Sequence, residues 1–179
     1  MATKGDEIVN PRTGQRMKFL LTSRDTNGEL LQIDCVNLPG GVKEPEHIHP
    51  YQENRFEIIS GRLMFCIAGK ERQINAGEFI SIPAKVPHYF WNGSDQEAHY
   101  IQEFRPALHS EFFFEALFDL ARDGKLNEQG TANILLMADF VPNFWNEIRV
   151  TKPPELIQSF LFGILRPVAR LLIHQGAQS

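Results

Sequence analysis

The segment that decides the fold covers residues 44–50 and reads EPEHIHP. Its two histidines, His47 and His49, are separated by a single residue. In a β-strand, residues i and i+2 point to the same face, so the two imidazoles would lie side by side and could share one cation. Pro45 and Pro50 bound the pair, as is typical of a short strand near the mouth of a pocket. The segment therefore predicts a strand that carries two metal ligands.

Further short strands surround this segment. Up to Pro106, runs rich in β-branched and aromatic residues alternate with turn signals. The strongest of these signals is Asn27-Gly28, because both residues tolerate a positive φ. The predicted strands cover residues 17–22, 30–37, 55–60, 62–67, 71–74, 79–82, 88–91 and 98–104. Strands this short and this closely spaced predict a β-sandwich or a barrel.

The segments around the histidines resemble the two sequence motifs of the cupin family. The first motif reads Gly, five residues, His-x-His, three or four residues, Glu, six residues, Gly. The second reads Gly, five residues, Pro-x-Gly, two residues, His, three residues, Asn. The matching residues are Gly41, His47, His49 and Gly61 in the first motif, and Gly77, Pro83, His88 and Asn92 in the second, with Lys85 in place of the inner glycine.

This resemblance implies a mainly β fold, a double-stranded antiparallel β-helix of the jelly-roll or cupin-barrel type. It also implies that His47, His49 and His88 occupy the positions of the family's metal ligands. One ligand position departs from the family pattern, because counting seven residues back from Gly61 reaches Asn54 where the family usually has a glutamate. Glu53 immediately precedes it.

Two hypotheses for the fourth ligand follow from this departure. On an ideal strand, neighbouring side chains point to opposite faces, so Asn54 would point inward and Glu53 outward. The metal would then have three histidines and water, with a weak oxygen ligand from Asn54. A β-bulge could instead turn Glu53 inward as the fourth ligand. Three imidazoles with open positions suit one divalent transition metal, which can be Fe, Mn, Ni, Cu or Zn.

The strand period also predicts what else lines the pocket. Residues that share a face with Asn54 or His88, or that lie across the barrel from them, should form an apolar and aromatic site for a small molecule. The same residues could equally fill the barrel core. The predicted pocket residues are Asn54, Phe56, Ile58, Phe65 (or its neighbour Met64), Phe90 and Asn92, with either Gln102 or Glu103 entering from the last strand.

After Pro106 the hydrophobic period becomes helical. Helices are predicted from Ser110, as N-cap, to Gly124, over residues 131–140, and from Pro153 onward. The chain therefore divides into a cupin barrel, residues 1–106, and a helical extension, residues 107–179, which is expected to pack on the barrel and to take part in a homodimer. Stretches such as residues 10–14, 49–57 and 121–125 resemble bacterial single-domain cupins with this extension, and the resemblance implies no particular reaction.

Composition narrows the classes of function. The net charge of −4 and a pI near 5.9 argue against a nucleic-acid partner. No apolar run reaches the ~20 residues of a membrane span, and the N-terminus has no signal-peptide core. Cys35 and Cys66 are expected to be buried free thiols of a cytoplasmic protein. His99, His109 and His174 are expected at the surface or in helix caps rather than at the metal.

Two functions remain open on the sequence, and no catalytic residue is identified. The first is a metal-dependent enzyme, an oxygenase or an isomerase, that acts on a small and partly apolar substrate. The second is a non-catalytic module that binds or senses a small molecule in the same pocket.

Overall fold

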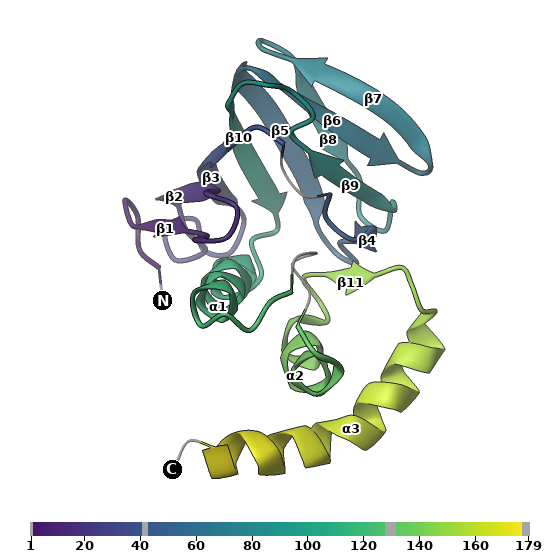
Figure 1. Cartoon of the computed structure of the whole chain (residues 1–179). Coiled ribbons are helices and arrows are strands. Elements are labelled where there is room, and N and C mark those ends of the chain that lie inside the picture. Colours follow the sequence, from purple (N-terminus) through teal and green to yellow (C-terminus); the bar gives the residue numbers. More distant parts are fainter. Residues whose placement is uncertain (1, 41–42, 128–131, 177–179) are drawn as a thin grey trace.

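The structure, a computed structural model (Figure 1), describes residues 2–40, 43–127 and 132–176, the last five of them as backbone. The predicted motif glycine Gly41, the predicted helix start at residue 131 and the side chain of His174 lie outside the described residues. Among the residues described, no helix combines the length and the apolar character that a membrane crossing requires.

Two antiparallel sheets form the body of the molecule (Figure 1). In spatial order, the first sheet contains β1 (Glu7–Val9), β2 (Arg16–Leu21), β3 (Leu31–Asn37), β10 (Ala98–Arg105), β5 (Glu53–Ser60) and β8 (Phe79–Ile82). The second contains β11 (Arg149–Val150), β4 (His47–Ile48), β9 (His88–Trp91), β6 (Arg62–Ile67) and β7 (Lys70–Asn75). This confirms the predicted mainly β architecture of two facing sheets.

Alternation of buried and more exposed side chains along the strands builds the core between the sheets. Along β10, Ala98, Tyr100, Gln102 and Phe104 are buried while their neighbours are more exposed. The rings of Phe56, Phe65 and Phe90 meet at the centre, with centroid separations of 4.9 to 5.6 Å. Each fully buried large side chain contributes roughly 1.5–3 kcal/mol of hydrophobic stabilisation, so this aromatic cluster holds the two sheets together.

Two strands were absent from the sequence prediction, β1 and β11, whereas the predicted strands differ from the observed ones by at most two residues at each end. Both missed strands are only two or three residues long and are too short to show a period. β1 pairs with β2, and β11 extends the second sheet beside β4. The C-terminal extension is therefore not purely helical, since β11 belongs to it.

The extension also contains the helices α1 (Ser110–Arg122), α2 (Ile134–Phe140) and α3 (Glu155–Gly176), with the 3-10 turn η1 (Val141–Phe144) after α2. α1 packs on the barrel through Phe114 and Phe118, which join the barrel core. α3 lies along α2 and extends away from the barrel (Figure 1). The predicted N-cap at Ser110 is wrong by one residue, because Ser110 is already the first helical residue and His109 is the N-cap. The Ser110 hydroxyl accepts a hydrogen bond from Gln52 Nε2 at 2.8 Å.

Gly61, which closes the first motif, has a structural reason to be glycine. Its φ is +73°, and a Cβ built there would lie 2.3 Å from the backbone oxygen of Glu97. We expect Gly61→Ala to lower the free energy of unfolding by roughly 3 kcal/mol or more, since left-handed strain adds to a backbone clash. Gly69→Ala is the matched control, because Gly69 has a φ of +76° and open space around it. Urea unfolding of both variants measures the difference, and equal losses would contradict the role of the clash.

Candidate metal centre

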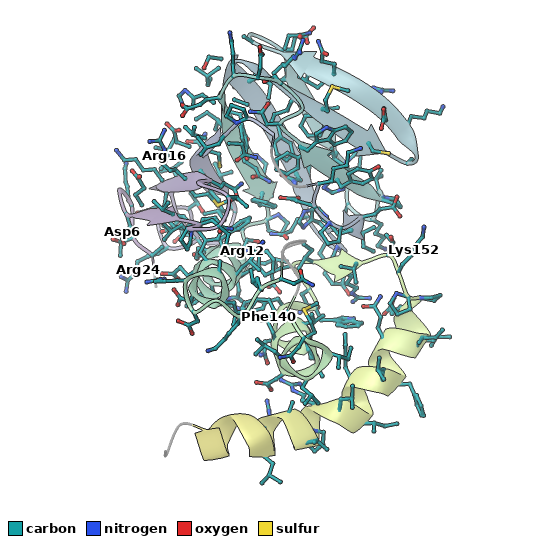
Figure 2. All side chains as sticks on the ribbon, viewed as in Figure 1. Asp6, Arg12, Arg16, Arg24, Phe140 and Lys152 are labelled. Atoms are coloured by element: carbon teal, nitrogen blue, oxygen red, sulfur yellow. The ribbon has the colours of Figure 1, made fainter. Side chains whose placement is uncertain are left out.

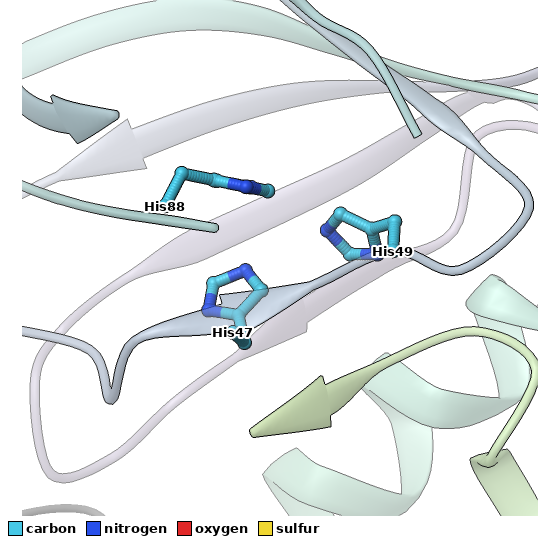
Figure 3. Close-up of side chains that lie close together, drawn as sticks. All are labelled: His47, His49 and His88. Carbon is cyan, nitrogen blue, oxygen red and sulfur yellow. The ribbon is translucent and has the colours of Figure 1, made fainter. Parts of the chain in front are cut away.

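The second sheet brings His47, His49 and His88 together (Figure 3). His47 on β4 is directly paired with His88 on β9, and His49 follows one residue after β4 ends. The ring centroids are 4.5 to 5.3 Å apart, and one nitrogen from each ring lies within 4.8 Å of the others. All three side chains are buried. The strand period therefore produces the same-face arrangement that the sequence predicts.

Backbone carbonyls fix the orientation and the tautomer of each ring. The Nδ1 atom of His47 lies 2.8 Å from the oxygen of Pro45, that of His88 lies 2.9 Å from Val86, and that of His49 lies 2.6 Å from Glu147. A carbonyl oxygen only accepts, so each Nδ1 must carry the proton and donate it. The lone pair is then left on Nε2, which is the arrangement that second-sphere partners impose on metal-binding histidines.

Burial keeps the three imidazoles neutral. Desolvation lowers the pKa of His47 well below its usual value, with smaller contributions from His49 and His88. Desolvation also lowers the pKa of His49 to about 3 and lowers the pKa of His88. Because a metal binds the neutral imidazole, protons compete little for these atoms near neutral pH.

One ligand atom is buried without any hydrogen bond in the described part of the chain, the Nε2 of His88. A buried acceptor left without a partner costs about 1–3 kcal/mol. A cation bound between the three rings would satisfy this atom, so the donor set fits a divalent transition metal.

The structure brings Asn54 to the histidines and leaves Glu53 outside. Asn54 is buried, and its Nδ2 lies 3.4 Å from His49 Nε2 while its Oδ1 accepts from Gln102 Nε2 at 3.1 Å. Glu53 is exposed, and its carboxylate accepts from Ser81 Oγ at 2.6 Å. The register shift in the β5–β10 pairing lies at the opposite end of β5, near Ser60, so no bulge turns Glu53 inward.

The other predicted pocket residues divide into two groups. Phe56, Ile58, Phe65 and Phe90 are buried in the barrel core, and three of them pack ring against ring. Asn92 has a different role, because its Nδ2 donates to the carbonyls of Asn37, Leu38 and Gln96 and so holds two loops together. Phe104 was not among the predicted residues, yet its ring lies 5.2 Å from that of His49. It shares the inward face of β10 with Gln102, a signal that the strand period already contained.

The extension supplies part of the site, which sequence reasoning missed. Glu147, between η1 and β11, provides the carbonyl that accepts from His49 Nδ1. β11 pairs with β4, so that Val150 lies opposite His47, and Thr151 N donates to Glu46 O at 3.0 Å. Residues about 100 positions away in the chain therefore hold the His-x-His strand in place, and no local sequence pattern predicts these contacts.

The remaining histidines lie away from the cluster, as expected where they are described. His99 Nε2 is 2.8 Å from Asp34 Oδ1, in a partly exposed pair. His109 is exposed at the start of α1. Cys35 and Cys66 are buried free thiols, as predicted.

Comparisons with known proteins agree with this geometry. Residues 35–102 match the family model described as a cupin domain. The chain is similar to quercetin 2,3-dioxygenase of Bacillus subtilis, with 25% identity over 88 residues, covering 49% of this chain and 25% of the relative. It is similar to acireductone dioxygenase of Bacillus velezensis, with 31% identity over 87 residues, covering 46% and 45%. The chain thus spans less than half the length of either relative.

Among solved structures, a predicted oxalate decarboxylase from Thermotoga maritima superimposes with a TM-score of 0.51 and 19% identity. The match covers 59% of this chain and 99% of that protein. At this level of identity the likeness concerns the fold alone.

Proposed function

Because residues 35–102 of this chain are a cupin domain, we propose that the chain holds a divalent transition metal on His47, His49 and His88 and acts as a metal-dependent enzyme on a small molecule. The observation that carries the proposal is the set of three buried Nε2 atoms, each freed by an Nδ1–H bond to a backbone carbonyl. Two curated relatives bear the names of dioxygenases, which favours an oxygenase among metal-dependent reactions.

Asn54 is our proposed fourth ligand, with Gln102 as its positioning residue. A half-turn of the Asn54 amide would turn Oδ1 toward the histidines, and a half-turn of Gln102 would let its Oε1 accept from Asn54 Nδ2. The oxygen and the nitrogen of an amide group are nearly equal in size, so a half-turn exchanges their positions without displacing the rest of the side chain. Gln102 Oε1, which is buried without a hydrogen bond among the described residues, would gain a partner in the exchange, while Gln102 Nε2 would give up its present bond to Asn54 Oδ1.

This donor set contains no carboxylate, and that bears on the substrate. Three imidazoles and an amide leave the two positive charges of the metal uncompensated in a buried site. Such a site favours a substrate that coordinates as an anion, for example an enolate or a carboxylate. When bound, the metal supplies an electrophilic centre with open positions for substrate and for dioxygen or water. The buried ring of Phe104, 5.2 Å from that of His49, would help to exclude water from the site.

Single substitutions distinguish the two candidate fourth ligands, Asn54 and Glu53. We expect Asn54→Ala to weaken metal binding by roughly 10-fold, and Glu53→Ala to leave it unchanged, because Glu53 is exposed on the opposite face of β5. Asn54→Asp is isosteric and adds a negative charge, so it should bind metal more tightly than the wild type. Titration of the metal-free proteins with cobalt(II) measures all three. Loss of metal in Glu53→Ala with retention in Asn54→Ala would assign the ligand to Glu53.

The enzyme and the binding module make different predictions for the purified protein. Iron, manganese, nickel or copper in elemental analysis, with oxygen uptake on an enolisable or phenolic compound, supports the oxygenase. Zinc or no metal, together with a tightly held metabolite found by mass spectrometry and no turnover, supports a non-catalytic binder. The observation that favours this second candidate is the neutral donor set, which contains no carboxylate.

We further propose that the protein works in the cytoplasm as a homodimer, with a small-molecule ligand and no nucleic-acid partner. The cytoplasmic proposal rests on Cys35 and Cys66, whose buried thiols are unpaired as in proteins of a reducing compartment.

A further inference from the structure

α3 leaves a row of large apolar side chains in solvent. Figure 2 shows side chains along this helix that project away from the rest of the chain. We call these residues the α3 row: Ile157, Phe160, Ile164, Val168 and Leu171, with exposed fractions of 54, 72, 55, 47 and 61%. Their separations of three, four, four and three residues place them on one face of the helix. The opposite face, with Phe162 and Ala169, is buried.

The two arginines of α3 point away from the α3 row. Arg166 and Arg170 lie 3.6 and 3.0 Å from Asp139 on α2, so both cations are held on the side away from the α3 row. A helix that lies on a membrane surface needs lysine or arginine free on its polar face. The two arginines are instead engaged within the chain, which favours an apolar protein surface as the occupant of the α3 row.

The spacing of the α3 row reads the same in both directions about Ile164. In an antiparallel pair of α3 helices related by a two-fold axis, Ile164 would therefore meet its own copy. Ile157 would lie near the partner's Leu171, and Phe160 near the partner's Val168. A self-complementary patch of this kind is the signature of an isologous dimer.

The exposed apolar area of the α3 row is also sufficient for a dimer interface. Side chains of this size and exposure form an apolar patch on the order of 600 Å² per chain, at the upper limit of what soluble monomers leave exposed. Pairing two such patches buries about 1,200 Å² in total, which reaches the lower limit of specific interfaces. We propose that two copies of this chain dimerise through the α3 row in antiparallel contact, rather than through an edge of a sheet.

Two matched substitutions test the proposal. Phe160→Glu introduces a charge into the α3 row, whereas Phe79→Glu does so on the edge strand β8, where Phe79 is 66% exposed. Sedimentation should show twice the chain mass of 20.5 kDa for the wild type and for Phe79→Glu. Phe160→Glu should raise the dimer dissociation constant by about 100-fold or more. Circular dichroism should be unchanged in both variants, because the substituted side chains are exposed.

Cross-linking tests the antiparallel geometry. Ile164→Cys should form a disulfide with its own copy under mild oxidation, whereas Ile157→Cys should cross-link only when mixed with Leu171→Cys. Cys35 and Cys66 are buried and do not interfere. A wild-type monomer at tens of micromolar overturns the proposal. So does dissociation by Phe79→Glu alone, or a monomer that binds phosphatidylcholine vesicles through the α3 row.

Discussion

His88→Ala should bind cobalt(II) more weakly than the wild type by well over 100-fold, a larger loss than the 10–100-fold typical of second-sphere changes. The Nε2 atom of His88 is fully buried without a hydrogen bond among the described residues, whereas that of His49 lies 3.4 Å from Asn54 Nδ2. Its ring is also fixed by the bond from Nδ1 to Val86 O, so the lone pair is held in position before any metal arrives. Removing the imidazole leaves two nitrogen ligands, too few for a stable site.

The matched control is His99→Ala. His99 lies on β10 in a partly exposed pair with Asp34, and its removal should leave the cobalt affinity and the d–d absorption spectrum unchanged. Circular dichroism of metal-free His88→Ala shows whether the barrel has folded. A folded His88→Ala protein that still binds one equivalent of metal with wild-type affinity would remove His88 from the site.

The metal-free protein should lose stability steeply as the pH falls from 6.5 to 4.5. The folded-state pKa values of His47, His49 and His88 are all lowered, that of His49 to about 3. Within this window the unfolded chain takes up protons that the folded chain does not. Stability is therefore present above the unfolded pKa of about 6.5 and is lost below it. Each histidine contributes up to about 1.4 kcal/mol per pH unit.

Glu44 acts in the opposite direction. Burial raises the pKa of its carboxyl to about 7, so the folded chain takes up a proton there between pH 7 and 4.5 that the unfolded chain does not, and stability rises as the pH falls. Glu44 therefore offsets part of the effect of the three histidines, and the net expectation is a loss of stability as the pH falls.

Urea unfolding in the presence of a chelator, at a series of pH values, measures this loss. Glu44→Gln should steepen the dependence and His49→Gln should make it shallower, since each removes one of the opposing groups. A flat profile between pH 6.5 and 4.5 would mean that the imidazoles are not desolvated in the folded protein.

The strand pattern and the two motifs were readable in the sequence because they are local. The period of two places His47 and His49 on one face whatever the rest of the chain does, and the spacing from Gly77 to Asn92 positions His88 on its own strand. The positive φ of Gly61 is also a local feature of its turn. The close contact that excludes a side chain at this position comes from Glu97, which is distant in the sequence. Predicting these features required only the geometry of a strand and a turn.

The choice between Asn54 and Glu53 depended on where β5 changes register, and a bulge leaves no signal in one sequence. Pairing with β10 places the irregularity at Ser60 and so keeps Asn54 inward. The partner of His49 Nδ1 is the carbonyl of Glu147, 98 residues away, which any residue type could provide. Backbone partners carry no side-chain signature, so only the folded chain identifies them.

For the three histidines, then, the sequence determined which residues meet and on which face of the strand. Tertiary structure decided which nitrogen of each ring is free, that Asn54 rather than Glu53 lies beside them, and that the α3 row is left in solvent. The first set follows from the local geometry of the backbone. The second depends on contacts between segments distant in the chain, whose free energies no local pattern encodes.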